Sequence, residues 1–162
     1  MQRTIRRALI SVFHKEGLAP IVERLKAHGV EILSTGGTQR AIEALGAEVT
    51  PVESVTQTAE MLGGRVKTLH PMVFGGILAR RDFAPDEADV ADHGIGPIDL
   101  VIVDLYPFEE TLASGAEEGD IIEKIDIGGI ALIRAAAKNF RDVICIPSRG
   151  QYSDLVEALA DG

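Results

Sequence analysis

Hydrophobic residues follow two patterns that alternate along the chain: short continuous runs, and segments in which they recur with the spacing of an α-helix. Helical spacing is clearest at residues 18–25, and it recurs at 41–45 and 130–137. The continuous runs have the length of β-strands and predict five of them, at residues 8–13, 30–33, 48–52, 100–105 and 143–146. The order of these segments predicts strands that alternate with helices.

The predicted strands are hydrophobic on both faces. Residues 100–103 read Leu-Val-Ile-Val, whereas a strand with one face in water would alternate hydrophobic and polar residues. A parallel sheet between two layers of helices buries both faces. We therefore predict an α/β fold with a roughly five-stranded, mainly parallel sheet flanked by helices, which binds its ligands at the carboxyl ends of the strands.

Polar clusters follow three of the predicted strands. Residues 13–17 follow the first strand, residues 34–38 the second and residues 104–108 the fourth. Because the carboxyl ends of parallel strands meet at one edge of the sheet, we expect these clusters to line a single crevice.

Composition narrows the class of protein. The chain has 162 residues, a length that suits one domain. Its net charge of −9 argues against nucleic-acid binding, which requires a basic face. Any site for an anion must then be local. The single cysteine, Cys145, lies in a hydrophobic run, which favours a buried structural thiol and a protein of the reducing cytoplasm.

No targeting, membrane or metal signal stands out. Residues 1–7 are basic, but the hydrophobic stretch after them ends at His14, too early for a signal peptide or a membrane span. The four histidines are scattered and no Cys/His cluster has zinc-site spacing, so we expect no metal and no membrane association.

Residues 63–71 combine two glycines with Arg65, Lys67, Thr68 and a histidine, and end at a proline. Glycines let the backbone approach a ligand closely, while a guanidinium and an ammonium group suit oxyanions. A surface turn with solvated charges explains this stretch equally well.

The segment from Thr35 to Thr38 holds two glycines between hydroxyls, just before a helix that we place near Gln39. Backbone amides at a helix N-terminus bind phosphate, but Thr38 as a simple helix cap is an equal alternative. Neither the Walker A loop nor the G-x-G-x-x-G pattern is present, so ATP and NAD are poorly supported.

Three single residues could complete such a site. Lys15 could add charge at a phosphate, or it could be an ordinary solvated lysine. Asp104 and Tyr106 follow a buried strand, where the tyrosine ring could stack on a heterocycle or simply cover the core.

Residues 124–129 lead into an alanine-rich helix. Asp126 before two glycines is typical of an N-cap, and Lys138 near the helix end suits the helix dipole. The first-turn amides could also stabilise an oxyanion. In one unbroken helix Asp126 and Lys138 would lie roughly 18 Å apart. A shared site would then need a late or bent helix, a lysine that reaches back, or two subunits.

Longer motifs carry a resemblance to a known family. With them the sequence resembles the N-terminal cyclohydrolase domain of the bifunctional aminoimidazole-carboxamide ribotide (AICAR) transformylase/IMP cyclohydrolase family of purine biosynthesis. The motifs span most of the chain between residues 15 and 139, and they are STGGT at 34–38, EMLGGRVKTLHP at 60–71, GILAR at 76–80, LYPF at 105–108, IDIGG at 125–129 and RAAAKN at 134–139.

The resemblance implies a methylglyoxal-synthase-like (MGS-like) fold and a reaction. The reaction is the closure of 5-formamidoimidazole-4-carboxamide ribotide (FAICAR) to IMP with loss of water, without a metal or organic cofactor. The resemblance implies FAICAR and IMP as small-molecule partners, and it makes a homodimer possible. It also implies that residues 1–162 are one cyclohydrolase domain, which lacks the family's terminal segment and the transformylase domain.

The resemblance also assigns roles to residues. Catalytic positions of the family match Lys67, Tyr106, Asp126 and Lys138, with Lys138 in the proton-transfer role. We expect Lys15 and the 35–38 segment at the phosphate, and Arg65, Lys67 and Thr68 nearer the ribose and base. The positions that match nucleotide binding are Phe13, His14, Lys15, Thr35, Gly36, Gly37, Thr38, Arg65, Val66, Thr68, Val103, Asp104, Ile127 and Gly128.

The sequence departs from the family pattern at Phe13 and His14, where the family commonly has a small polar residue and then Asp or Asn. Two alternatives share the fold. One is methylglyoxal synthase, which the Arg65 and Asp126 motifs fit poorly. The other is a nucleotide-sensing module without turnover, like the allosteric domain of carbamoyl phosphate synthetase, which would need no proton-transfer residues.

Overall fold

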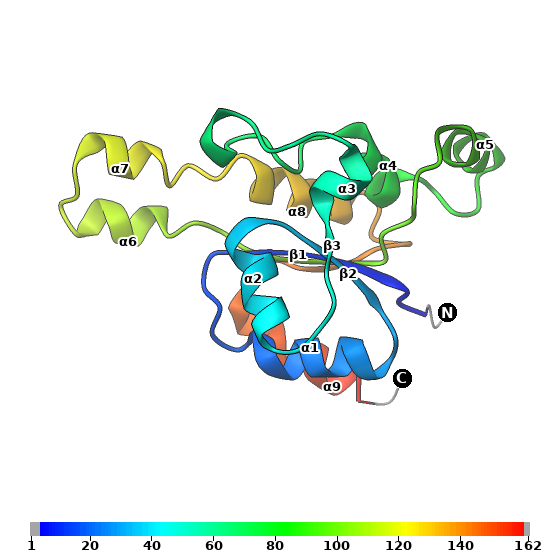
Figure 1. The fold of residues 1–162 in the computed structure, drawn as a ribbon, viewed down its shortest axis with the longest axis horizontal. Helices are drawn as coiled ribbons and strands as arrows, with labels where there is room; N and C mark the ends of the chain where they lie inside the picture. The colour runs from blue at the N-terminus through cyan, green and yellow to red at the C-terminus, as the bar shows by residue number, and fades with distance from the viewer. Residues whose placement is uncertain (1–3, 161–162) are drawn as a thin grey trace.

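The computed structural model describes residues 4–160, which form a five-stranded parallel sheet in the order β3-β2-β1-β4-β5 (Figure 1). The strands are β1 (Arg7–Val12), β2 (Glu31–Ser34), β3 (Thr50–Pro51), β4 (Leu100–Asp104) and β5 (Ile144–Ile146). Each of the five predicted strands is confirmed, with its ends within two residues of the prediction. The α/β fold with a parallel sheet is confirmed as well.

Helices cover both faces of the sheet (Figure 1). On one face, α1 (Leu18–Ala27), α2 (Gly36–Ala44) and α9 (Tyr152–Ala158) pack on Ala8, Ile10 and Val12 of β1. On the other face, α3 (Val52–Thr56), α4 (Pro71–Leu78) and α8 (Gly128–Lys138) pack on Leu9 and on β4. Alternate residues of β1 therefore enter different cores, which explains why the run is hydrophobic at successive positions.

Helix α5 (Ala84–His93) lies at one end of the molecule, and α6 (Phe108–Ala113) and α7 (Glu118–Ile122) lie at the other (Figure 1). Short 3₁₀ helices, η1 (Leu62–Gly64) and η2 (Arg149–Gln151), complete the elements. None of α5, α6 and α7 contains a buried residue. In the part of the chain that the structure describes, no helix has the length and apolar character needed to cross a membrane.

One helix boundary differs from the prediction. α2 begins at Gly36 rather than near Gln39, and Thr35 is its N-cap residue in an extended conformation. The amide of Gln39 donates to the carbonyl of Thr35 at 3.3 Å, so the first turn closes across the two glycines. Gly36 has a φ of +55°, a conformation that side chains rarely adopt, which is why a glycine suits this entry.

Candidate active site

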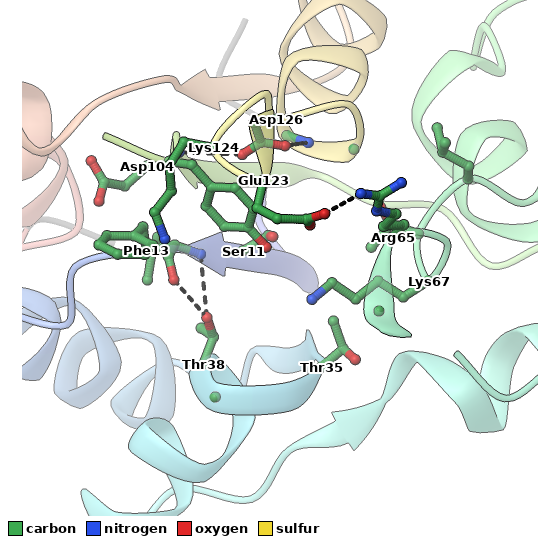
Figure 2. Close-up of a pocket in the computed structure, with 18 of the residues that line it drawn as sticks. Ser11, Phe13, Thr35, Thr38, Arg65, Lys67, Asp104, Glu123, Lys124 and Asp126 are labelled. Carbon is green, nitrogen blue, oxygen red and sulfur yellow. Dashed lines mark hydrogen bonds and ion pairs between the residues drawn. The ribbon is translucent and has the colours of Figure 1, made fainter. Parts of the chain in front are cut away.

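A cavity of about 410 Å³ opens at the carboxyl edge of the sheet (Figure 2). Its wall comes from the ends of β1 and β4, the start of α2, residues 64–69 and residues 123–129. The predicted meeting of polar clusters in one crevice is therefore confirmed. The cavity includes Phe13, Lys15, Thr35, Gly37, Thr38, Arg65, Lys67, Thr68, Asp104, Tyr106, Asp126 and Gly128 among the predicted site residues.

Six predicted site residues do not line this cavity. His14, Gly36, Val66, Val103 and Ile127 each lie next in sequence to a residue that does, whereas Lys138 lies at the far end of α8. Val103 is fully buried in the core, so its contribution to a ligand would be through the backbone. The assigned roles of all these residues remain predictions.

Lys15 folds back over the end of β1. Its ammonium group donates to the carbonyl oxygens of Val12 and Phe13, the latter at 2.8 Å, and lies 3.4 Å from the hydroxyl of Thr38. Burial lowers the pKa of Lys15, an effect that Asp104 partly opposes and Lys67 adds to. A phosphate group beside this lysine would supply the negative charge that the neutral oxygens around it do not.

Thr38 ties α2 to β1 rather than capping the helix. Its hydroxyl donates to the carbonyl of Val12 at 2.9 Å and lies 3.3 Å from the amide of the same residue. The side chain therefore makes no capping bond, and this alternative is wrong. Thr35 donates its hydroxyl to Glu53 of α3 at 2.8 Å, so both threonines help to fix the start of α2 beside Lys15.

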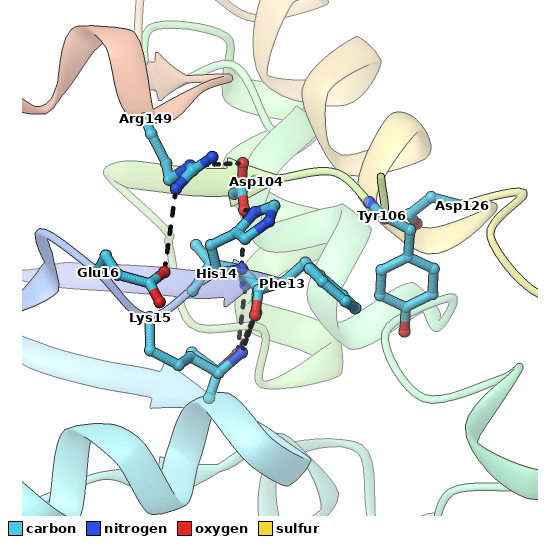
Figure 3. Close-up of polar contacts among 10 residues, drawn as sticks. Phe13, His14, Lys15, Glu16, Asp104, Tyr106, Asp126 and Arg149 are labelled. Atoms are coloured by element: carbon cyan, nitrogen blue, oxygen red, sulfur yellow. Dashed lines mark hydrogen bonds and ion pairs between the residues drawn. The ribbon is translucent and has the colours of Figure 1, made fainter. Parts of the chain in front are cut away.

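Asp104 holds the turn that carries Lys15 (Figure 3). Its carboxylate accepts a hydrogen bond from the amide of His14 at 2.8 Å and lies 2.7 Å from Nδ1 of the same residue. Its carbonyl oxygen accepts from the amide of Phe13 at 3.0 Å. Arg149 approaches the same carboxylate at 3.7 Å and also lies 3.9 Å from Glu16.

Two aromatic rings stand side by side at the cavity. The ring centroids of Phe13 and Tyr106 are 5.6 Å apart, with planes inclined at 71°. The ammonium group of Lys124 lies 5.2 Å from the centre of the Phe13 ring. Such edge-to-face pairs are favourable in themselves and leave flat apolar surface for a heterocyclic base.

Asp126 is fixed at the entry to α8. Its carboxylate accepts from the amide of Gly129 at 2.6 Å and from the amide of Tyr106 at 3.4 Å. Ile127 is the formal N-cap residue but has a helical conformation and makes no side-chain cap, whereas Asp126 accepts from a first-turn amide and so makes the predicted capping bond. A Cβ atom at residue 129 would lie 2.6 Å from the Asp126 carboxylate, so this contact requires glycine.

The predicted binding loop at residues 63–71 divides into a hairpin and a helix start. Met61 and Val66 exchange two backbone hydrogen bonds, of 2.9 and 3.3 Å, and the glycines between them have φ of +66° and +87°. The side chain of Lys67 points into the cavity (Figure 2). His70 instead accepts from the amide of Met72 at 3.2 Å and caps α4.

Lys138 is the last residue of α8, and its side chain is exposed. The helix is continuous from Gly128, which lines the cavity, and ten steps along it cover about 15 Å. A late start or a bend is therefore excluded as a way to bring Lys138 to Asp126.

Sequence reasoning missed three charged residues at or near the site: Glu123, Lys124 and Arg149. Arg149 follows β5, so the rule that predicted the other clusters, polar residues after a strand end, could have found it. Glu123 and Lys124 lie beyond α7, and no local pattern indicates which way they point.

The chain is similar to known proteins in sequence and in fold. The family model described as "MGS-like domain" matches residues 17–131. A crystal structure of ForH superposes with a TM-score of 0.81 at 34% identity, covering 97% of this chain and 79% of that one.

Two curated relatives share the name bifunctional purine biosynthesis protein PurH. The protein from Bacteroides thetaiotaomicron is 58% identical over 159 residues, which cover 98% of this chain and 31% of the relative. The protein from Anaeromyxobacter sp. is 54% identical over 155 residues, which cover 96% and 30%. The chain thus spans less than a third of the length of these relatives.

Proposed function

The chain belongs to the family of MGS-like domains, and from this premise we propose that it is an IMP cyclohydrolase domain that closes FAICAR to IMP with loss of water. Its relatives at 58% and 54% identity are named for purine biosynthesis. The observation that carries the proposal is the cavity at the strand ends, where Lys15, Lys67, Tyr106 and Asp126 meet. We also propose that this domain is part of a bifunctional enzyme that has AICAR transformylase activity as well.

The arrangement suits a phosphorylated ligand with a heterocycle. Lys15 and the start of α2 would bind the phosphate, because an ammonium group and helix amides both favour an anion there. Phe13 and Tyr106 would pack against the base. In this order the reacting groups of the base would lie near Lys67 and Asp126.

In ring closure the carboxamide nitrogen attacks the formyl carbon, and the formyl oxygen leaves as water. The amide is a weak nucleophile, so the protein must hold the two groups together and stabilise charge on the formyl oxygen. Asp126, whose carboxylate accepts hydrogen bonds from two backbone amides, would orient the carboxamide of the substrate. Lys67 would stabilise the oxygen, and Lys138 would transfer protons.

The proposal is tested by following IMP formation from FAICAR by absorbance. We expect turnover by the wild-type chain, and Lys67→Met should lower kcat about 100-fold or more with a smaller change in KM. Lys26→Met is the matched control, because Lys26 bonds to the carbonyl of Gly46 at 2.7 Å outside the cavity and its loss should leave turnover intact. IMP binding without any turnover would instead favour the nucleotide-sensing alternative.

A further inference from the structure

One ion pair connects the segment after η1 with the segment after α7 at the edge of the cavity. Arg65, which follows η1, pairs with Glu123, which follows α7 (Figure 2). The side chains are 62% and 54% exposed, and both residues line the 410 Å³ cavity. Both also line a neighbouring pocket of about 300 Å³, so the ion pair stands on the boundary between the two spaces.

Both segments are weakly anchored in the fold. No residue of η1, α6 or α7 is buried. Leu62, Gly63 and Gly64 all have positive φ, a backbone conformation that is unfavourable for Leu62, the one of these three residues with a side chain. Segments with little buried surface have low local stability and rearrange readily.

The ion pair also changes the charge that the cavity offers to a ligand. Four cations line the cavity, Lys15, Arg65, Lys67 and Lys124, together with the carboxylates Asp104, Glu123 and Asp126. Pairing with Glu123 occupies part of the Arg65 guanidinium, raises its pKa and lowers the pKa of Glu123. A guanidinium binds a carboxylate and a phosphate with the same donor geometry. Arg65 lines the same cavity as Lys15, so a phosphate bound at Lys15 would compete with Glu123 for Arg65, which puts Arg65 closer to the phosphate than the sequence led us to expect.

We propose that Glu123 is a further residue of the site, an internal counter-ion that holds Arg65 at the cavity wall and is displaced by the anionic ligand. The proposal takes the ligand class, a nucleoside monophosphate, from the proposed function. An exposed ion pair is worth little, so the exchange costs only a few-fold in affinity. The ion pair keeps Arg65 positioned at the cavity before a ligand binds.

The test is a double-mutant cycle read by calorimetric titration with IMP. Glu123→Gln should bind IMP about two- to five-fold more tightly than the wild-type chain, because the competing carboxylate is gone. Arg65→Gln should bind more weakly, and adding Glu123→Gln to it should change the affinity by no more than about 1.5-fold. Glu118→Gln is the matched control, since it removes the same charge from an exposed position of α7 that does not line the cavity.

The proposal is overturned if Glu123→Gln binds IMP no more tightly than Glu118→Gln does. It is also overturned if the gain persists in the Arg65→Gln background, since the carboxylate would then act on the ligand without Arg65. Circular dichroism checks that each variant is folded.

Repeating the cycle with inorganic pyrophosphate separates this proposal from the proposed function. Binding of pyrophosphate but not of IMP would contradict the proposed function, while the cycle would still measure the exchange at Arg65. Absence of binding by both probes would overturn the exchange itself.

Discussion

Lys15 and Asp104 illustrate how single side chains prepare the cavity. Each has partners in the protein: Lys15 donates to backbone oxygens, and Asp104 accepts from the amide of His14. The carboxylate that the sequence assigned to ligand binding therefore holds the turn in place as well. Because the amide and the ring of His14 both contact the Asp104 carboxylate, the departure from the family pattern at this position preserves a fixed turn.

Tyr152 provides a test of burial at the level of one side chain. It is 7% exposed, and its hydroxyl has no hydrogen-bond partner among the described residues. Burial, together with the charge of Asp104, raises the pKa of Tyr152 to about 12. An unfolded tyrosine ionises near pH 10, so between about pH 10 and 12 the native state binds more protons than the unfolded state and stability falls as the pH rises.

We therefore expect Tyr152→Phe to lose less stability than the wild-type chain between about pH 10 and 12. At pH 7 the variant should be as stable or up to about 1 kcal/mol more stable, because an unpaired buried hydroxyl is removed. Urea unfolding at pH 7, 10 and 11 measures both effects. Parallel pH curves for the two proteins would show that the hydroxyl is not buried as described.

At the scale of elements, the entry to α8 depends on a contact that only glycine permits. Gly129→Ala would place a Cβ atom 2.6 Å from the Asp126 carboxylate, which must then move. We expect kcat for IMP formation to fall about ten- to hundred-fold while the fold is kept, since a displaced catalytic group is costly. Steady-state kinetics and thermal unfolding, run side by side, measure the two effects.

Gly119→Ala is the control for this change. It lies in α7, and a Cβ atom there meets nothing within 4 Å, so activity should be retained. Equal kcat values for Gly129→Ala and Gly119→Ala would argue against a role for the position of Asp126.

Helices and strands that bury hydrophobic residues could be predicted from the sequence, whereas helices that bury none could not. The run from Leu100 to Val103 is buried at every position, so its pattern gave both the strand and the parallel sheet. α5, α6 and α7 bury nothing, so no hydrophobic stripe marks them. The start of α2 was missed because two glycines, poor helix formers, occupy its first turn.

The candidate site divides in the same way. Residues after strand ends could be predicted to meet, because a parallel sheet brings those ends together. The contact of Arg149 with Asp104 depends on β5 lying beside β4, which a local pattern does not encode. The pair of Arg65 and Glu123 joins residues 58 positions apart in sequence and was equally out of reach.

At the scale of the whole molecule, the position of Lys138 constrains how a complete site could be assembled. Asp126 precedes α8, at the cavity, and Lys138 ends the helix about 15 Å away along its axis. A lysine side chain reaches less than half of that distance by extended-chain dimensions, roughly 6 Å. If both residues act on one substrate, Lys138 must come from a second copy of the chain.

This predicts complementation between two inactive variants, Asp126→Asn and Lys138→Ala. Each alone should lack turnover, whereas co-refolding them in equal amounts should restore about a quarter of wild-type activity, since half of the dimers are mixed and each mixed dimer has one intact site. Asp126→Asn with Lys67→Met is the control: both residues line the same cavity, so a mixed dimer keeps no intact site and no activity should return. Recovery in neither mixture would place Lys138 outside the site, and near-normal turnover by Lys138→Ala alone would remove its proposed role in proton transfer.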